Sequence, residues 1–442
     1  MKKIITMILA AIMILSLAAC AGEKSAQIVS EVINGLYDVD GETDADATEE
    51  SVEDETEEQT EFVAEEQSDK VTLDGMSSDG LLDSSDMFTE RDLTQSADTS
   101  DAEQIALTDG EDAVITSAGV YVLSGSAENF TLTVNASKDD KVQIVLDGVS
   151  ITNDDAPCIY VKCADKVFVT TTGSDNYLSV TGKFSSDGTT NTDAVIFSKD
   201  DLVLNGVGTL TVKSTDNGIT SKDDLKITGG TLTVVCESDA LEVNDSIRIA
   251  DGDITIRSNK DGLHAENGDD DSLGYVYICG GTLNVTASDD AIHAVSVVQI
   301  DAGDLTLTGA ECIEGTYIQI NGGSIDITAS DDGINGARKS SAYTAAVEIN
   351  GGYIKIAMGQ GDTDGIDSNG NLFINGGTLN ITAQSPFDYD GTAQHNGGTI
   401  IVNGTETDTV TNQMMGGGMG GVPGGMQGGM PNGMQGGPGG RG

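Results

Sequence analysis

Residues 318–335, IQINGGSIDITASDDGIN, carry a pattern of apolar and polar positions that predicts three short strands joined by two corners. Within each run the apolar residues alternate with polar ones, which is the period of a β-strand and not that of a helix. The pair Gly322–Gly323 separates the first run from the second, as a turn with positive φ would. The sequence Asp-Asp-Gly at 331–333 separates the second run from the third.

This pattern recurs along the chain, so the repeat determines the expected fold. Clear copies begin at Leu225, Val276, Val347 and Leu372, and variants with a single glycine occupy 247–256 and 298–307. A repeat of this length, built from strands of period two, predicts a solenoid in which each coil buries its apolar face only against its neighbours. We therefore predict an all-β fold, a right-handed parallel β-helix flanked by disordered tails.

The same pattern sets the expected domain boundaries. We place the β-helix at residues 105–404, because no internal linker interrupts the strand pattern there. Residues 21–104 include a block, 38–69, that is rich in Asp and Glu and lacks Lys and Arg, which predicts an extended, disordered acidic tether. Residues 405–442 are rich in Gly and Met and predict a disordered tail.

Residues 1–20 have the organisation of a bacterial lipoprotein signal peptide. Lys2 and Lys3 precede an apolar run from 4 to 19, and the ending Leu-Ala-Ala-Cys at 17–20 resembles a lipobox. An uncleaved membrane anchor is the alternative, but the run is short for a membrane span and stops at small residues. We predict that Cys20 is lipidated and anchors the protein to the extracellular face of the cell membrane.

Composition and charge narrow the classes of partner. The 442-residue chain has no Trp, 4% aromatic residues, 57 Gly and a formal net charge of −52. So large a negative charge argues against nucleic acid as a partner, and against electrostatic docking on anionic lipid, because phosphates attract basic surfaces. The charge is compatible with the binding of cations.

Three runs carry a resemblance to a known family: VQIVLDGVSITNDDAPCIYVKCADKVFVTT at 142–171, NGITSKDDLKITGGTLTV at 217–234 and GGTLNVTASDDAI at 280–292. They resemble the bacterial carbohydrate-binding β-helix lipoproteins, and the similarity covers about residues 105–404. The resemblance implies a fold similar to pectate lyases, binding of cellulose or acidic sugars, and bound calcium. It implies no catalytic residue that could be carried over to this chain.

Aligning the coils at their second corner produces two columns of polar residues. The first column is Asn217, Asp239, Asp261, Asp290, Glu311, Asp332, Asp364 and Asp390. The second, three positions later, is Thr220, Glu242, His264, His293, Glu314, Asn335, Asp367 and Ala393. Coils of a β-solenoid stack about 4.8 Å apart, where two unit charges repel by roughly 3.5 kcal/mol at an effective dielectric near 20. Such a ladder needs hydration, protonation or bridging cations.

Calcium suits this corner because it prefers hard oxygen ligands. We predict Ca²⁺ as the cofactor, and the candidate ligands are Asp261, Asp289, Asp290, Asp331, Asp332, Asp362, Asp364 and Asp367. The alternative is that Asp and Asn occupy these corners only because their side chains bond their own backbone in turns. That alternative explains one aspartate per corner, but not doubled aspartates followed by a further acid.

Three insertions, 266–274, 336–346 and 358–363, lie beside this corner and would wall a groove along it. Calcium in the groove could bridge to uronate carboxylates, which would give an acidic protein affinity for a plant-type or acidic polysaccharide. The candidate sugar contacts are Tyr275, Tyr277, Tyr343, Tyr353, Arg338 and Lys339.

Three alternatives remain open at this stage. Outward threonines of the second strand, such as Thr231 and Thr233, could lie against cellulose, although Thr is also simply a good exposed strand residue. A calcium-dependent polysaccharide lyase would need a base, for which Lys260, Arg338 and Lys339 are the cations near the corner. A structural or adhesion protein of the cell surface is the third. We expect a monomer that binds polysaccharide rather than cleaving it.

Overall fold

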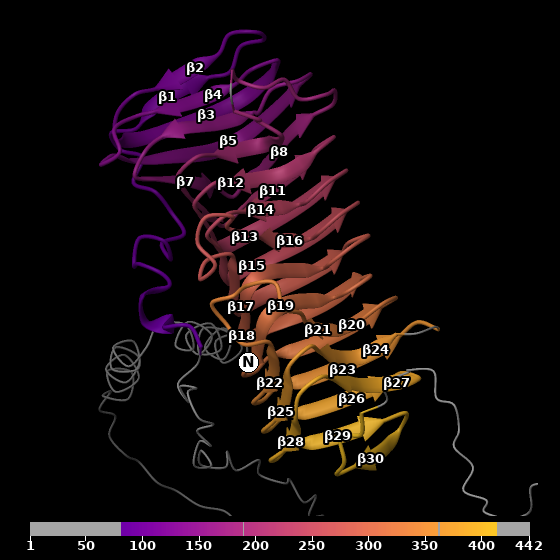
Figure 1. The fold of residues 1–442 in the computed structure, drawn as a ribbon. Helices are drawn as coiled ribbons and strands as arrows, with labels where there is room; N and C mark the ends of the chain where they lie inside the picture. The colour runs from indigo at the N-terminus through magenta and orange to yellow at the C-terminus, as the bar shows by residue number, and fades with distance from the viewer. Residues whose placement is uncertain (1–80, 189, 361–362, 413–442) are drawn as a thin grey trace, which may run out of the picture.

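The computed structural model describes residues 81–188, 190–360 and 363–412. These residues form strands stacked as successive coils, with one 3-10 turn, η1 (Ser84–Asp86), and no α-helix among them (Figure 1). The predicted all-β class is therefore confirmed. None of the described segments forms a helix long and apolar enough to cross a membrane. Cys20 and the predicted signal peptide lie outside the described residues.

Consecutive coils pair strand for strand, and this pairing defines three faces of the stack. Face 1 comprises β1 (Glu103–Ala106), β3 (Gly119–Glu128), β5 (Lys141–Asn153), β7 (Lys166–Thr171), β10 (Asp201–Gly206), β13 (Asp224–Cys236), β15 (Ser246–Ser258), β17 (Tyr275–Thr286), β18 (Ile292–Gly309), β19 (Ile313–Ile320), β22 (Ala346–Ile349), β25 (Asn371–Ile374) and β28 (Ala393–His395). The long strands β3, β5, β13, β15, β17 and β18 turn a corner and continue onto face 2.

Faces 2 and 3 complete each coil. Face 2 adds β8 (Asp175–Val180), β11 (Thr209–Lys213), β20 (Ser324–Ala329), β23 (Tyr353–Met358), β26 (Thr378–Thr382), β29 (Thr399–Val402) and β30 (Thr405–Thr407). Face 3 comprises β2 (Ala113–Ile115), β4 (Leu132–Asn135), β6 (Ile159–Cys163), β9 (Ala194–Ser198), β12 (Asn217–Ser221), β14 (Leu241–Val243), β16 (Leu263–Ala265), the first residues of β18 and β19, β21 (Ile334–Gly336), β24 (Asp364–Ser368) and β27 (Ser385–Tyr389). The strand pairs are parallel until β29 meets β30, which is antiparallel.

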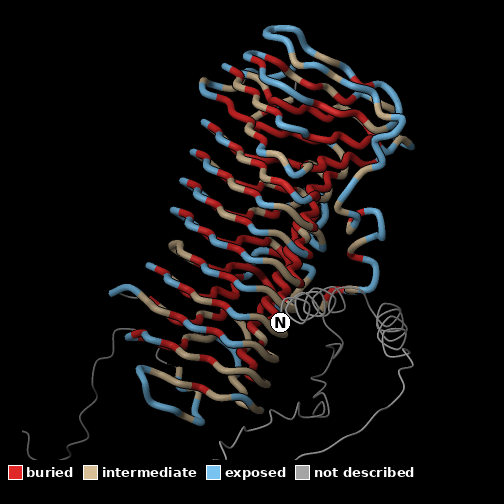
Figure 2. Tube along the Cα trace, turned by 180° about the vertical axis from the view of Figure 1, so that it is seen from behind, coloured by how far each residue is buried: buried red, intermediate tan, exposed pale blue. Residues whose placement is uncertain are grey.

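The interior is filled by apolar side chains that stack on equivalent side chains of the next coil. On face 1 one such stack is Ile227, Ile249, Ile278, Ile300, Ile320, Ile349 and Ile374. Each of these isoleucines is buried, and full burial of such a side chain stabilises the fold by about 1.5–3 kcal/mol. Figure 2 shows the buried positions as threads through the whole stack.

Asparagine and glycine together build the corner between faces 1 and 2. The side-chain amide of Asn396 donates to Asn375 Oδ1 at 2.8 Å, Asn375 donates to Asn350 at 2.7 Å, and Asn350 donates to Asn321 at 2.8 Å. This ladder satisfies amides that would otherwise compete with the strands. The second glycine of each following Gly-Gly pair has a positive φ, as at Gly352, where φ is 85°, and this conformation favours glycine because it has no Cβ.

Residues 81–95, called the strap below, lie across face 1 and run from coil to coil (indigo in Figure 1). Leu82 and Met87 are buried against that face, and the amide N–H of Leu82 donates to Gln299 Oε1 at 3.0 Å. The predicted boundary at residue 105 is therefore too late, because the last part of the predicted tether packs on the stack and β1 begins at Glu103.

The C-terminal end of the stack is covered by the chain that follows the last coil. Strand β30, which we had assigned to the disordered tail, folds back antiparallel on β29. The side chain of Asn412 then donates to the carbonyl oxygen of Tyr389 at 2.7 Å. The predicted boundary at residue 404 is therefore too early, because residues 405–412 belong to this cap. Residues 413–442 lie outside the described ranges.

Replacing Gly352 by alanine is expected to destabilise the stack more than replacing Gly404. Both glycines have a positive φ, 85° and 76°, so a side chain at either position adds strain of about 1–2 kcal/mol. At Gly352 a Cβ would also stand 2.8 Å from the carbonyl oxygen of Gly323, whereas at Gly404 it meets no atom within 4 Å. Urea unfolding of both variants measures the difference. Equal losses of unfolding free energy would show that the corner relaxes without steric penalty.

Candidate functional site

Two rows of polar residues run along face 3, one residue from each coil. Backbone hydrogen bonds align the first, the corner row, which is Asn217, Asp239, Asp261, Asp290, Glu311, Asp332 and Asp364. Strand pairing aligns the second, the face 3 column, which is Thr220, Glu242, His264, His293, Glu314, Asn335, Asp367 and Asp388. Between them each coil places a residue inside the stack, such as Leu263 or Ile292, which is fully buried.

The last coil departs from the predicted alignment. The sequence comparison matched Asp390 and Ala393 to Asp364 and Asp367, whereas the structure pairs Ser385 with Asp364 and Asp388 with Asp367. The reason is the apolar residue between them. Phe387 pairs with Ile366, and both are buried. The apolar residue that enters the core therefore sets the register, and the acidic residues follow it.

Aspartates of the corner row bind the backbone of the next coil. Oδ1 of Asp239 accepts the amide N–H of Asp261 at 3.0 Å, and Oδ1 of Asp261 accepts that of Asp290 at 3.0 Å. Asp332 accepts the amide N–H of Asp364 in the same way, also at 3.0 Å. One carboxylate oxygen in each of these coils is thus used to satisfy a corner amide. Aspartate side chains accept backbone amides in the same way in turns, but here the amide belongs to the next coil. The second oxygen, Oδ2, stays available for another partner.

In the middle of the column that partner is histidine. His264 Nδ1 lies 2.6 Å from Asp261 Oδ2, and His293 Nδ1 lies 2.8 Å from Asp290 Oδ2. The two imidazole rings are stacked, with centroids 4.8 Å apart and planes inclined by 8°. His293 Nδ1 also lies 2.8 Å from Glu314 Oε2. These side chains form one hydrogen-bonded and stacked group, in which His293, Asp290 and Glu314 are buried and His264 is partly exposed.

The charges in this middle section compensate one another. Burial opposes protonation of His293, but hydrogen bonds with Asp290 and Glu314 outweigh it and raise its pKa to about 10. Burial would raise the pKa of Glu314, but His293 and Lys339 hold it at about 2. Lys339 Nζ lies 2.8 Å from Glu314 Oε2. His293 is therefore an imidazolium at neutral pH, and Glu314 remains ionised. Burial still raises the pKa of Asp290 to about 6 and that of Glu311 to about 8, so the compensation is centred on Glu314.

The C-terminal section of the column lacks this compensation. Burial and the charges of nearby carboxylates raise the pKa of Asp332 to about 7 and that of Asp367 to about 6. Asn335 Oδ1, Thr363 Oγ1 and Ser385 Oγ in the same coils are buried and have no hydrogen-bond partner among the described residues. Carboxylates with raised pKa values beside unsatisfied oxygens indicate a place where positive charge would be stabilised.

The predicted calcium ligands therefore form two groups rather than one. Carboxylate oxygens of Asp261, Asp289 and Asp290 lie within 4.8 Å of one another. The second group is Asp331, Asp332, Asp364 and Asp367, in which the other three carboxylates raise the pKa of Asp332. The coil that carries Glu311 and Glu314 separates the two groups. Asp362 lies outside the described residues.

Sequence reasoning missed a further acidic cluster where face 3 turns into face 1. Carboxylate oxygens of Asp201, Asp223 and Asp224 lie within 4.8 Å of one another. Burial and neighbouring carboxylates raise the pKa of Asp223 to about 7. The signal in the sequence is the repeated Ser-Lys-Asp-Asp at 198–201 and 221–224, which we had not aligned.

Most of the predicted sugar contacts do not meet in one groove. Tyr275 and Tyr277 lie on face 1 and are buried, since Tyr275 Oη contacts Met87 and the Tyr277 ring lies 6.4 Å from that of Phe88. They were expected to be exposed platforms, and this is wrong because the strap covers them. Tyr353 is 47% exposed but belongs to face 2. Tyr343 is half-buried.

Two of the predicted insertions do meet. Ser340 Oγ in the segment 336–346 donates to the carbonyl oxygen of Asp271 in the segment 266–274 at 2.6 Å. The first of these segments also carries the predicted sugar contacts Arg338 and Lys339. Arg338 pairs with Asp390 at 3.0 Å, and Lys339 pairs with Glu314, so this loop joins the central and C-terminal sections of the column.

The lysines near the column are poorly suited to act as general bases. Asp239 raises the pKa of Lys260 by its charge, and its carboxylate lies 3.2 Å from the ammonium. Burial would lower the pKa of Lys339, but Glu314 raises it. A lysine with a raised pKa is protonated at neutral pH and cannot accept a proton.

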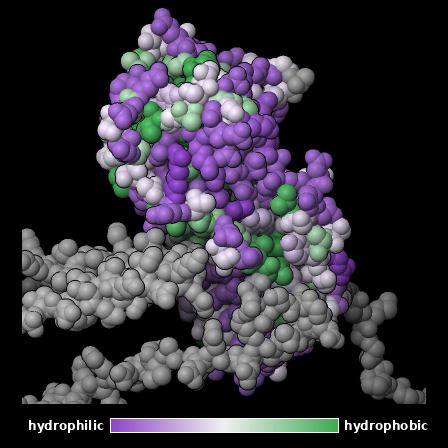
Figure 3. All heavy atoms as spheres, turned by 90° about the vertical axis from the view of Figure 1, so that its left-hand side faces the viewer, coloured by the Kyte–Doolittle hydropathy of each residue, from purple (hydrophilic) through white to green (hydrophobic). Residues whose placement is uncertain are grey.

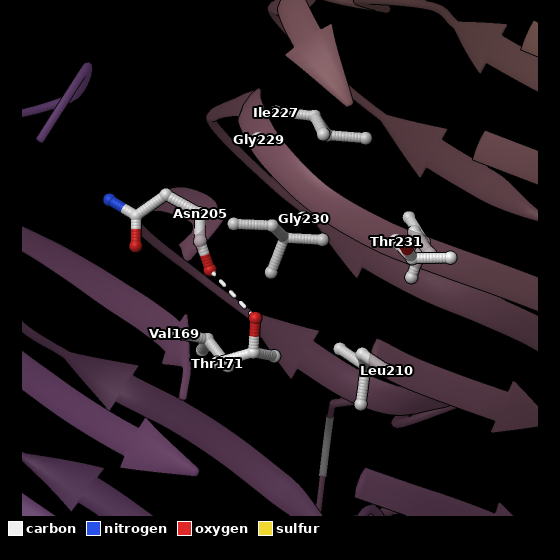
Figure 4. Close-up of a pocket in the computed structure, with 10 residues that line it drawn as sticks. Val169, Thr171, Asn205, Leu210, Ile227, Gly229, Gly230 and Thr231 are labelled. Atoms are coloured by element: carbon white, nitrogen blue, oxygen red, sulfur yellow. Dashed lines mark hydrogen bonds between the residues drawn. The ribbon is translucent and has the colours of Figure 1, made fainter. Parts of the chain in front are cut away.

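A cavity between the coils offers no alternative site. Figure 4 shows it at the corner of Gly229 and Gly230, lined by side chains such as Val169, Leu210 and Ile227. The cavity holds about one water molecule, so it is a packing defect beneath the glycine corner rather than a sugar pocket.

His293 is expected to stay protonated well above neutral pH. Its folded pKa of about 10 exceeds the ordinary value of 6.5, so its contribution to stability is complete below pH 6.5 and is lost as the pH rises towards 10. NMR titration of the imidazole resonances measures this directly. Titration of His293 near pH 6.5 would contradict the assigned ion pairs.

Comparison with known proteins identifies the family of this chain. A family model described as carbohydrate-binding domain-containing protein matches residues 109–362 and 310–413. A carbohydrate-binding domain-containing protein of Acetivibrio thermocellus is 46% identical over 198 residues, which are 44% of this chain and 69% of that protein. A solved structure of a polysaccharide lyase-like protein from C. thermocellum, a gadolinium derivative, is 27% identical with a TM-score of 0.42, covering 59% of this chain and 98% of that chain. The chain belongs to the family of carbohydrate-binding domain-containing proteins.

Proposed function

We propose that the protein binds acidic polysaccharide along face 3, with Ca²⁺ at the C-terminal section of the column as the bridge. The observation that carries this proposal is the raised pKa values of Asp332 and Asp367 beside buried oxygens of Asn335 and Thr363 that have no hydrogen-bond partner among the described residues. We further infer that the coils wind as a right-handed parallel β-helix, since parallel strands joined by crossovers are right-handed in about 98% of cases.

Calcium would suit the donor types of this group, although its carboxylates, unlike those of Asp261, Asp289 and Asp290, do not all lie within 4.8 Å of one another and would have to be drawn together by the ion. Asp332, Asp364 and Asp367 supply carboxylate oxygens, and Asn335 supplies an amide oxygen that has no partner among the described residues. Ca²⁺ takes six to eight such hard oxygen ligands and tolerates irregular geometry. The group of Asp261, Asp289 and Asp290 is less favourable, because His264 and His293 already supply positive charge there.

The cation also explains how an acidic protein would hold an acidic glycan. The chain carries a formal net charge of −52, which repels a uronate polymer at long range. A calcium ion held by protein carboxylates retains coordination positions that a uronate carboxylate can fill. Hydroxyl groups of the sugar would then meet the loop that carries Arg338 and Lys339. Binding in this form requires the metal.

Face 2 supports a second candidate, the binding of cellulose. Thr209 pairs with Thr231, and Thr211 pairs with Thr233, so hydroxyl groups are aligned along this face. Tyr353 is exposed on the same face. A hydroxyl ladder with an exposed ring could bind an uncharged, flat polysaccharide without any metal.

We also propose where the protein acts and in what oligomeric state. It is a monomer, anchored to the extracellular face of the cell membrane through a lipid on Cys20.

Calcium binding is expected to depend on the C-terminal section alone. Titration calorimetry should show calcium binding to the intact chain and its loss in the double variant Asp332→Asn/Asp367→Asn. Pull-down on insoluble polygalacturonate should show retention in calcium that the chelator EDTA strongly reduces, because the uronate reaches the protein on face 3 through the metal. The control Asp253→Asn/Asp304→Asn removes two exposed carboxylates from face 2 and should behave like the unmodified chain. The proposal would be refuted if calorimetry detects no heat of calcium binding, or if retention on polygalacturonate is the same in EDTA as in calcium.

Without calcium, the melting temperature is expected to fall as pH rises between about 4 and 7. The folded pKa values of Asp332 and Asp367 are raised to about 7 and about 6, above the ordinary 3.8. A raised carboxyl pKa means that the folded state loses stability as pH rises through that value. Calcium should flatten the slope, because it binds the ionised carboxylates. Identical slopes in calcium and in EDTA would place the metal elsewhere.

A further inference from the structure

The strap makes an ordered series of contacts across face 1. Beneath it lies the face 1 column, a row of outward residues aligned by strand pairing: Phe168, Val203, Lys226, Arg248, Tyr277, Gln299 and Gln319. The backbone N–H groups of Leu81 and Leu82 donate to Gln319 and Gln299 at 3.2 and 3.0 Å. Further along, Arg91 stacks on Phe168, with its guanidinium carbon 4.4 Å from the ring centre.

The strap inserts one carboxylate between two lysines. Asp92 is fully buried, and its two oxygens lie 3.1 Å from Lys226 Nζ and 3.4 Å from Lys166 Nζ. Its Oδ2 also accepts the amide N–H of Thr89 at 2.9 Å. Lys166 keeps a second partner, Asp201, at 3.4 Å. Lys166 and Lys226 are 8% and 4% exposed, so Asp92 closes a buried pair of ammonium groups, of which only Lys166 has a further ion-pair partner, Asp201, among the described residues.

These lysines belong to the outer surface of the coils. Lys226 lies between Leu225 and Ile227, which both point into the core, and strand geometry directs its side chain to the opposite side. Burying lysines beneath a strap carries a desolvation penalty of several kcal/mol per ion unless their partners are well placed. Apolar residues in place of a buried ion pair are often as stabilising or more so. The ionic contact is therefore weak evidence that the strap serves stability alone.

The chemistry of the covered column matches an acidic sugar chain. Aromatic rings at Phe168 and Tyr277 suit pyranose faces, the amides of Gln299 and Gln319 suit hydroxyl groups, and Lys166 and Lys226 suit a carboxylate. Figure 3 shows that the described surface on this side is mostly hydrophilic, with apolar atoms in small patches. The rings at the centre of the column are covered by the strap and not presented to solvent.

We propose that face 1 is a second, metal-independent binding surface for uronate-containing glycans, and that the strap is its built-in competitor, with Asp92 in the place of a uronate carboxylate. The class of ligand rests on the proposed function, but the site does not, because its positive charge comes from lysine rather than calcium. A glycan must displace the strap to bind, so its apparent affinity is reduced by the fraction of molecules whose strap is released.

The test measures binding of oligogalacturonate in EDTA, where the calcium site is silent. Asp92→Asn removes the competing charge while keeping the shape of the side chain, and it should strengthen binding at least tenfold. Adding Lys166→Gln and Lys226→Gln should abolish that gain. The control Asp83→Asn removes an exposed carboxylate from the same strap, which bonds only Ser85 among the described residues, and it should leave binding unchanged. A neutral cello-oligosaccharide of equal length should not respond.

Hydrogen exchange of residues 81–95 shows whether the strap is released. Saturating oligogalacturonate should increase exchange there in the unmodified chain. If Asp92→Asn alone leaves exchange unchanged, Leu82→Ser and Met87→Ser are added to free the strap. A freed strap without any gain in oligogalacturonate binding overturns the inference and makes the segment a structural brace. If the chain with a freed strap binds oligogalacturonate without metal but no binding to polygalacturonate depends on calcium, the proposed function is refuted. The inference about face 1 would still hold in that case.

Discussion

The register between coils is the constraint on which the rest of the structure depends. Parallel pairing places each residue beside its counterpart in the next coil, about 4.8 Å away. In the core and in much of the face 3 column of the described stack, similar residues therefore lie on similar residues. For isoleucine this is favourable, because each apolar surface covers the next. For aspartate it is unfavourable, because each carboxylate repels the next.

The corner row and the face 3 column reduce that repulsion in three different ways. Corner aspartates give one oxygen to a backbone amide of the neighbouring coil, which stabilises their ionised form. In the middle of the column the stacked pair His264 and His293 supplies positive charge from within the ladder. Towards the C-terminus neither arrangement compensates the negative charge fully, and protonation or an external cation must neutralise the rest. The function we propose uses the section where the protein leaves the charge uncompensated.

Sequence patterns predicted the repeat and the aligned corners, because both depend on the local alternation of apolar and polar residues. The last coil was misaligned because acidic residues were matched to one another, while the structure aligns Phe387 with Ile366. Tyr275 and Tyr277 were misjudged for a different reason. The strap that covers them has no strand pattern, and its contacts are distant in sequence, such as Asp92 with Lys226, 134 residues away. Only folding brings such partners together, so no local pattern could reveal them.

The antiparallel return of β30 bears on how these molecules behave at high concentration. A stack of parallel strands ends in unpaired backbone groups that would accept a further coil from another molecule and so grow into a fibre. Strand β30 uses the free edge of β29 on face 2, and Asn412 uses a carbonyl oxygen of the last coil at Tyr389. Because β30 runs in the opposite direction, a further parallel strand cannot pair with β29 at this end of the stack. Neighbouring copies are thereby discouraged from joining end to end, and each keeps its long faces available to the surroundings.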